Sequence, residues 1–168
     1  MSRGFVKEDD QEEAPLIPPR PALPDGATNY VTQNGLQALK REKNLMEHEI
    51  ANLVETDERE RRRALALLNG KLNLLNERIQ SARLLSTIEN HHEVRFGAYV
   101  TYTINGTSQP VTIQIVGVDE ADVKQRKISF VAPIAKTLTG LKVGDRTTLQ
   151  LKQEQRQLEI IKIDYDKS

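Results

Sequence analysis

The stretch from Leu36 to Ala82 decides the fold, and it reads LQALKREKNLMEHEIANLVETDERERRRALALLNGKLNLLNERIQSA. Its apolar residues recur in alternating steps of three and four, the spacing of the a and d positions of a coiled coil. The seam positions are Leu36, Leu39, Lys43, Met46, Ile50 and Leu53 on the first half, and Leu65, Leu68, Leu72, Leu75, Ile79 and Ala82 on the second. The two sets mirror each other, so the spacing predicts an antiparallel helical hairpin that folds back at Arg59.

The helices of this hairpin are expected to be long. Thr32 can cap the first helix, because its hydroxyl can accept a hydrogen bond from a backbone amide of the first turn. We expect that helix from Gln33 to Val54, about 33 Å at 1.5 Å per residue, and the return helix from Asp57 to Thr87. The charged run Glu55 to Arg63 then lies at the tip, where a finger can deliver charge at a distance.

Composition limits the protein class. The chain has 168 residues, 38% of them hydrophobic, with 24 basic and 24 acidic side chains and no cysteine. A balanced charge disfavours non-specific binding of duplex DNA, and the missing cysteines exclude disulfides and thiol catalysis. There is no apolar run of the roughly 20 residues that span a bilayer and no signal-peptide pattern, so we expect a cytoplasmic protein without membrane contact.

Residues 1–29 form an acidic tail rich in proline, which we expect to be extended or disordered on its own. Its apolar residues Phe5, Val6, Leu16 and Ile17 leave open that the tail docks on its own protein or on a partner.

The pattern changes after residues 30–88, the expected hairpin domain, and a polar linker at 89–93. Alternating segments predict strands at 94–104, 111–118, 127–131, 146–151 and 157–165, and Pro133 opens a short helix that Gly140 ends. Asn105-Gly106 is a strong turn signal between the first two strands. Residues 94–168 are therefore expected to form an antiparallel sheet covered by one helix, and the whole chain an α+β protein.

Three runs in this second domain carry a family resemblance, namely Val94–Val100, Ile115–Asp122 and Ser129–Ala135. Together they closely resemble the C-terminal domain of the bacterial transcription elongation factors GreA and GreB. The resemblance implies an N-terminal coiled coil and an FKBP-like C-terminal domain. It also implies a factor that is not itself an enzyme: it binds RNA polymerase at the secondary channel and activates the polymerase's own cleavage of backtracked transcripts.

The resemblance also assigns a role to the tip. In that family an Asp and a Glu three residues apart complete the shell of a Mg²⁺ ion at the polymerase active centre, and here this role transfers to Asp57 and Glu60. Magnesium prefers oxygen ligands, and two residues at this spacing lie on one face of a helical turn. No cofactor is expected to bind stably, since the ion is shared with the polymerase. Thr56 and Arg61 stand where the family has Gly and Asn.

Other interpretations of the same residues stay open. Asp57 with Glu60 also fits a capping box, and acids in a first turn complement the helix dipole. Arg59, Arg61 and Arg62 are candidates to contact RNA or polymerase at the tip. Pro133 is a candidate polymerase contact, although a helix start explains it equally well.

The expected partners are RNA polymerase and the 3′ end of nascent RNA, with DNA reached only through the polymerase and the protein itself a monomer. Two alternative functions remain: a regulator that occupies the secondary channel without stimulating cleavage, and a coiled-coil interaction module without a role in catalysis.

Overall fold

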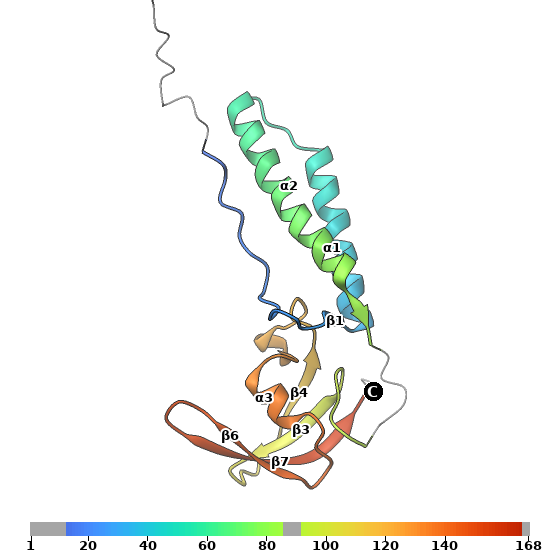
Figure 1. The fold of residues 1–168 in the computed structure, drawn as a ribbon, viewed down its shortest axis with the longest axis vertical. Helices are drawn as coiled ribbons and strands as arrows, with labels where there is room; N and C mark the ends of the chain where they lie inside the picture. Colours follow the sequence, from blue (N-terminus) through green and yellow to red (C-terminus); the bar gives the residue numbers. More distant parts are fainter. Residues whose placement is uncertain (1–12, 86–91, 166–168) are drawn as a thin grey trace, which may run out of the picture.

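A computed structural model describes residues 13–85 and 92–165 of the chain. It consists of a helical finger and a C-terminal domain built on a twisted sheet, with the finger standing on the sheet domain (Figure 1). The expected α+β class, with a helical hairpin followed by a sheet domain, is confirmed. Residues 1–12, Phe5 and Val6 among them, lie outside the described residues, as do residues 86–91, which include the start of the polar segment at 89–93.

The finger is formed by α1 (Gln33–Ala51) and α2 (Glu58–Ser81). Thr32 caps α1 as expected, because its Oγ1 accepts a hydrogen bond of 3.0 Å from the N–H of Gly35. Every seam position of the mirrored pattern is buried or half-buried, while most other positions of α1 are exposed. Leu39 and Leu75 are the most buried of these side chains, and with Val31 they form the core at the base of the finger.

The fold-back lies a few residues earlier than its predicted centre. Residues 52–57 connect the helices, so Arg59 is in the first turn of α2 and the expected end of α1 at Val54 is wrong. The helix ends at its C-cap, Asn52, whose backbone N–H and side-chain amide both donate to the carbonyl of His48.

The return helix also ends earlier than Thr87, which itself lies outside the described residues. After Ser81 the chain forms β2 (Arg83–Leu84), which pairs in parallel with β1 (Tyr30–Val31). The N–H of Arg83 donates to the carbonyl of Asn29 at 2.8 Å. Tertiary pairing with the segment before α1 therefore replaces the last helical turns.

Within residues 92–165, five strands form the sheet in the order β5-β4-β3-β7-β6. They are β3 (Tyr99–Ile104), β4 (Val111–Val116), β5 (Lys127–Ser129), β6 (Arg146–Gln150) and β7 (Gln155–Asp164). The helix α3 (Pro133–Leu138) buries Ala135 and Leu138 in the core of this domain. The rest of the buried core comes mainly from alternate residues of β3, β4 and β7.

The sheet is mixed, which corrects the expected antiparallel arrangement. β5 pairs in parallel with β4, from Gln114 opposite Lys127 to Val116 opposite Ser129. The reason is the loop after β4, which contains the short 3₁₀ turn η2 (Val123–Gln125) and closes with paired backbone hydrogen bonds between Asp122 and Lys127. This loop returns the chain to the level of Gln114 before β5 begins.

Residues 13–29, here called the arm, run along the finger beside α2 and meet the sheet domain at its base (Figure 1). The arm has no regular secondary structure, apart from a turn near Pro24. Within the described residues, no helix is both long and apolar enough to cross a membrane.

Candidate functional site

Asp57 ends the fold-back by capping α2. Its Oδ1 accepts a hydrogen bond of 3.0 Å from the N–H of Glu60, and its own N–H donates to Oε1 of Glu55 at 3.1 Å. In a full capping box Glu60 would accept that second bond, so Glu55 takes the place expected for Glu60. The cap therefore uses one carboxylate oxygen of Asp57, and the carboxylate of Glu60 does not take part in it.

Asp57 and Glu60 are both exposed and lie within one helical turn at the far end of the finger. Among the described residues, no group of three or more His, Cys, Asp or Glu side chains is placed to hold a metal ion. Two carboxylates are too few for an independent magnesium site, which needs about six oxygen ligands. The donor set at the tip therefore fits an ion whose other ligands come from water and a partner.

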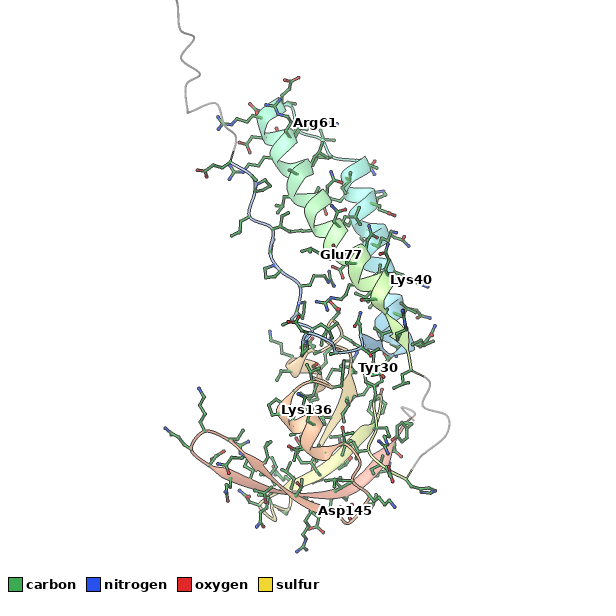
Figure 2. All side chains as sticks on the ribbon, in the orientation of Figure 1. Tyr30, Lys40, Arg61, Glu77, Lys136 and Asp145 are labelled. Carbon is green, nitrogen blue, oxygen red and sulfur yellow. The ribbon has the colours of Figure 1, made fainter. Side chains whose placement is uncertain are left out.

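The predicted tip arginines, Arg59, Arg61 and Arg62, are exposed in the first turns of α2, and Figure 2 shows Arg61 at the end of the finger opposite Tyr30. Arg62 lies 3.9 Å from the carboxylate of Glu58, an i,i+4 pair. The acids and bases are interleaved, so the tip presents both signs of charge to a partner.

Sequence reasoning missed an apolar residue at the tip. Val54 is 90% exposed and lies in the fold-back, next to Leu53 at the last seam position. The signal was the position of Val54, just after the last seam residue of the first half and just before the charged run.

Pro133 is exposed at the first position of α3. Its N-cap, Ala132, makes no side-chain hydrogen bond to the helix, and the fixed φ of proline suits the first helical position. Its ring is accessible, and its role as a polymerase contact stays a prediction.

The base of the finger meets the sheet domain at a close-packed contact, here called the joint: Tyr30, Thr32 and Arg78 against the loop 117–120. Gly117 is required there, because a Cβ at this position would lie 2.5 Å from the carbonyl oxygen of Tyr30. The Tyr30 ring packs at 5.9 Å from Phe96 and 5.8 Å from Phe130, measured between ring centroids, with the second pair edge-to-face. Such contacts fix the position of the base of the finger against the sheet domain.

Two adjacent carboxylates of the loop bind the two helices of the finger. Glu120 accepts a hydrogen bond of 2.6 Å from the hydroxyl of Thr32, at the N-terminus of α1, and its other oxygen lies 3.6 Å from Lys127. Asp119 lies 3.3 Å from the guanidinium of Arg78, near the C-terminus of α2. Both carboxylates are more than nine-tenths buried, so these contacts are shielded from water.

One side of the joint, the loop 117–120, belongs to a region with known relatives. Residues 89–165 match the family model described as "Transcription elongation factor, GreA/GreB, C-term". The C-terminal domain therefore matches the GreA/GreB family model. The resemblance carried by its three sequence runs is thus confirmed, and the loop 117–120 that holds the finger lies within this GreA/GreB domain.

Relatives named transcription elongation factor GreA support the same assignment. The chain is 37% identical over 101 residues to GreA of Hyphomonas neptunium, covering 60% of this chain and 64% of that protein. It is 32% identical over 103 residues to GreA of Halorhodospira halophila, covering 60% and 65%. The chain therefore spans slightly less than two thirds of the length of these GreA relatives.

Among solved structures, the chain is similar to a GreA/GreB factor from Nitrosomonas europaea, with 17% identity, a TM-score of 0.42, and coverage of 81% of this chain and 98% of that one. It is also similar to the GreA factor homolog Gfh1 of Thermus thermophilus, with 18% identity, a TM-score of 0.39, and coverage of 82% and 99%. The GreA/GreB family model does not extend to the tip or the arm.

Proposed function

We propose that this protein is a Gre-type transcription elongation factor, which binds RNA polymerase through the secondary channel and stimulates cleavage of backtracked transcripts. The observation that carries the proposal is a GreA/GreB domain packed against a helical finger with exposed carboxylates at its far end. The protein acts as a factor for the polymerase's own nuclease and is not itself the catalyst.

The finger suits delivery of the tip into a channel. α2 has 24 residues, which at 1.5 Å per residue is about 36 Å. An apolar cluster that includes Leu39, Met46 and Leu75 holds the two helices together in the lower part of the finger. The joint fixes its base, so that docking of the GreA/GreB domain would set where the tip goes.

Asp57 and Glu60 would supply the carboxylate oxygens for a Mg²⁺ ion shared with the polymerase, which when bound activates a water for attack on the RNA. The cap presents Asp57 in a fixed orientation, because Oδ1 is held by the amide of Glu60. The cap does not use Oδ2 of Asp57 or the carboxylate of Glu60, and both residues are exposed.

The test uses backtracked polymerase complexes with Mg²⁺, in which RNA shortening is followed after addition of the protein. Asp57→Asn with Glu60→Gln should lower the cleavage rate by about 10²-fold, the usual cost of removing preorganised charge from a reacting centre. Asn is as good an N-cap as Asp, so the helix start is preserved. Glu58→Gln is the matched control, since it removes an exposed carboxylate of the same turn and should leave cleavage near the wild-type rate.

A second candidate function also has support from the structure of the tip. In this alternative, the protein is a regulator that binds in the channel without stimulating cleavage. Asp57 is already engaged as a cap, and Arg59, Arg61 and Arg62 place positive charge beside the carboxylates. Binding of wild-type protein to the complex with no shortening of the RNA would favour this regulator and reject the cleavage factor. Failure to bind polymerase at all would reject both.

The polymerase contact at α3 is tested separately. Pro133→Ala keeps a good helix former at the first position, so α3 should persist while the exposed ring is lost. A weaker affinity for polymerase, with unchanged stability of the free protein, supports a contact at Pro133. An unchanged affinity assigns the proline to the helix start alone.

A further inference from the structure

Arg20 of the arm joins the finger to the C-terminal domain by its side chain. Its Nη1 and Nη2 donate to the two carboxylate oxygens of Glu42 on α1, at 2.8 and 3.1 Å, and its Nε donates to Oδ1 of Asp119 at 2.9 Å. The side chain of Arg20 is 17% exposed and that of Asp119 is 5% exposed. Bidentate guanidinium–carboxylate pairs of this kind are directional and stronger than single contacts.

Asp119 is held from the opposite side by Arg78 of α2, whose Nε lies 3.3 Å from Oδ2. Arg78 also donates to the carbonyl oxygen of Pro21 in the arm. Asp119 thus lies between guanidinium groups from the arm and from α2. The pKa of Arg20 is raised chiefly by its hydrogen bond to Glu42, against a lowering influence from burial, and Asp119 raises it further. An arginine is charged at any physiological pH in either case.

The arm is also seated along α2, away from the joint. Ile17 packs over Gly70, where a Cβ would lie 2.0 Å from the Ile17 Cδ1 atom. The neighbouring Leu16 faces outward and is 92% exposed, so the arm presents one side to the helix. A glycine inside a helix costs about 1 kcal/mol relative to alanine, and here it provides the space that Ile17 fills.

We propose that the arm is an intramolecular clasp that fixes the direction of the finger relative to the C-terminal domain, with Arg20 as its closing contact. The side chain of Arg20 makes this connection, because it binds Glu42 of α1 and Asp119 of the sheet domain at the same time. Removing Arg20 leaves a buried Asp119 with half of its compensating charge, and an uncompensated buried charge favours an opened arrangement that admits water.

The length of the finger amplifies any change at the joint. At about 36 Å, a rotation of about 10° at the base would move the tip by about 6 Å. Asp57 and Glu60 would then miss a target that they reach in the clasped form. The clasp is thus a positioning device for the tip, and it goes beyond the proposed function because it holds for the free protein.

The test measures the direction of the finger without polymerase. The chain has no cysteine, so Glu49→Cys on α1 and Lys136→Cys on α3 introduce a single pair of exposed sites for spin labels. Pulsed electron–electron double resonance should give one narrow distribution of distances between the two labels in the otherwise wild-type protein. Arg20→Ala should broaden and shift it, and Arg20→Lys, which keeps the charge but not the bidentate geometry, should give an intermediate width.

Arg41→Ala is the matched control, an exposed arginine of α1 next to Glu42, and it should leave the distribution unchanged. Asp119→Asn removes the charge that Arg20 meets in the sheet domain and should broaden the distribution as Arg20→Ala does. Circular dichroism confirms that each variant keeps its helices. If the distance distribution of Arg20→Ala matches that of the wild type, the clasp proposal is wrong, whatever the cleavage assay shows. A broadened distribution supports the clasp even if the protein does not bind polymerase.

Discussion

Glu120 accepts a hydrogen bond of 2.6 Å from the hydroxyl of Thr32, the residue that caps α1. The same hydroxyl oxygen accepts the N–H of Gly35, so one side chain both starts the finger and attaches it to the C-terminal domain. The carboxylate also lies near the positive end of the α1 dipole, a favourable place for a negative charge. Local helix formation and domain orientation therefore share one residue.

Thr32→Ala should lower the free energy of unfolding by about 1–3 kcal/mol, because it removes an N-cap and one donor to a buried carboxylate. Thr32→Ser keeps the hydroxyl and should stay close to wild type. Urea unfolding followed by circular dichroism measures both. Equal losses for the two variants would show that the methyl group, and not the hydroxyl, carries the effect.

Gly70→Ala should have different effects in two backgrounds. In the wild type the new Cβ collides with Ile17, so the gain in helix propensity is offset by displacement of the arm. In Ile17→Ala the space is open, and the same change should stabilise the protein by about 1 kcal/mol. A double-mutant cycle on unfolding free energies gives the coupling. If Gly70→Ala has the same effect in both backgrounds, Ile17 does not dock on α2.

Asp57→Ala should destabilise the protein by about 0.5–2 kcal/mol through loss of the α2 cap, whereas Asp57→Ser should cost little, since serine caps as well as aspartate. Thermal unfolding of the free protein measures this. Both variants lack the carboxylate, so a cleavage defect common to both cannot come from the cap. A defect only in Asp57→Ala would assign Asp57 to helix capping alone.

Stability should fall at alkaline pH. Burial raises the pKa of the Tyr102 hydroxyl, against a lowering influence from Arg126 and Arg156, and burial is also the main cause of the raised pKa of Tyr165. The folded state then holds these protons more tightly than the unfolded chain, in which tyrosine titrates near pH 10. The contribution to stability is complete below about pH 10 and is lost as the pH rises through the higher folded-state pKa values.

Urea unfolding between about pH 8 and about pH 11 measures the slope. Tyr102→Phe cannot ionise and should flatten the alkaline fall. Tyr165→Phe should do the same, with an additional loss at all pH values because the Tyr165 hydroxyl donates to the carbonyl of Glu93. A slope that neither variant changes would mean that other groups cause the alkaline fall.

Much of the finger could be predicted because its information is local. The steps of three and four from Leu36 to Ala82 specify which side chains meet along the seam, and Thr32 and Asp57 are caps that follow from side-chain chemistry. The helix ends were misplaced where other contacts take over from the helix: β2 pairs with β1, and Asn52 caps the last turn of α1 at the His48 carbonyl.

The sequence by itself determined the helical hairpin, its charged tip and the GreA/GreB character of the C-terminal domain, since periodicity and motif residues are readable one segment at a time. Only the tertiary structure decided the parallel pairing of β5, the seat of Ile17 on Gly70 and the contacts of Asp119 with Arg20 and Arg78. Arg20 and Asp119 lie 99 positions apart. No pattern in the sequence around either residue indicates that the other is its partner. The direction of the finger depends on such distant pairs, because their energy arises only once folding has excluded water around them.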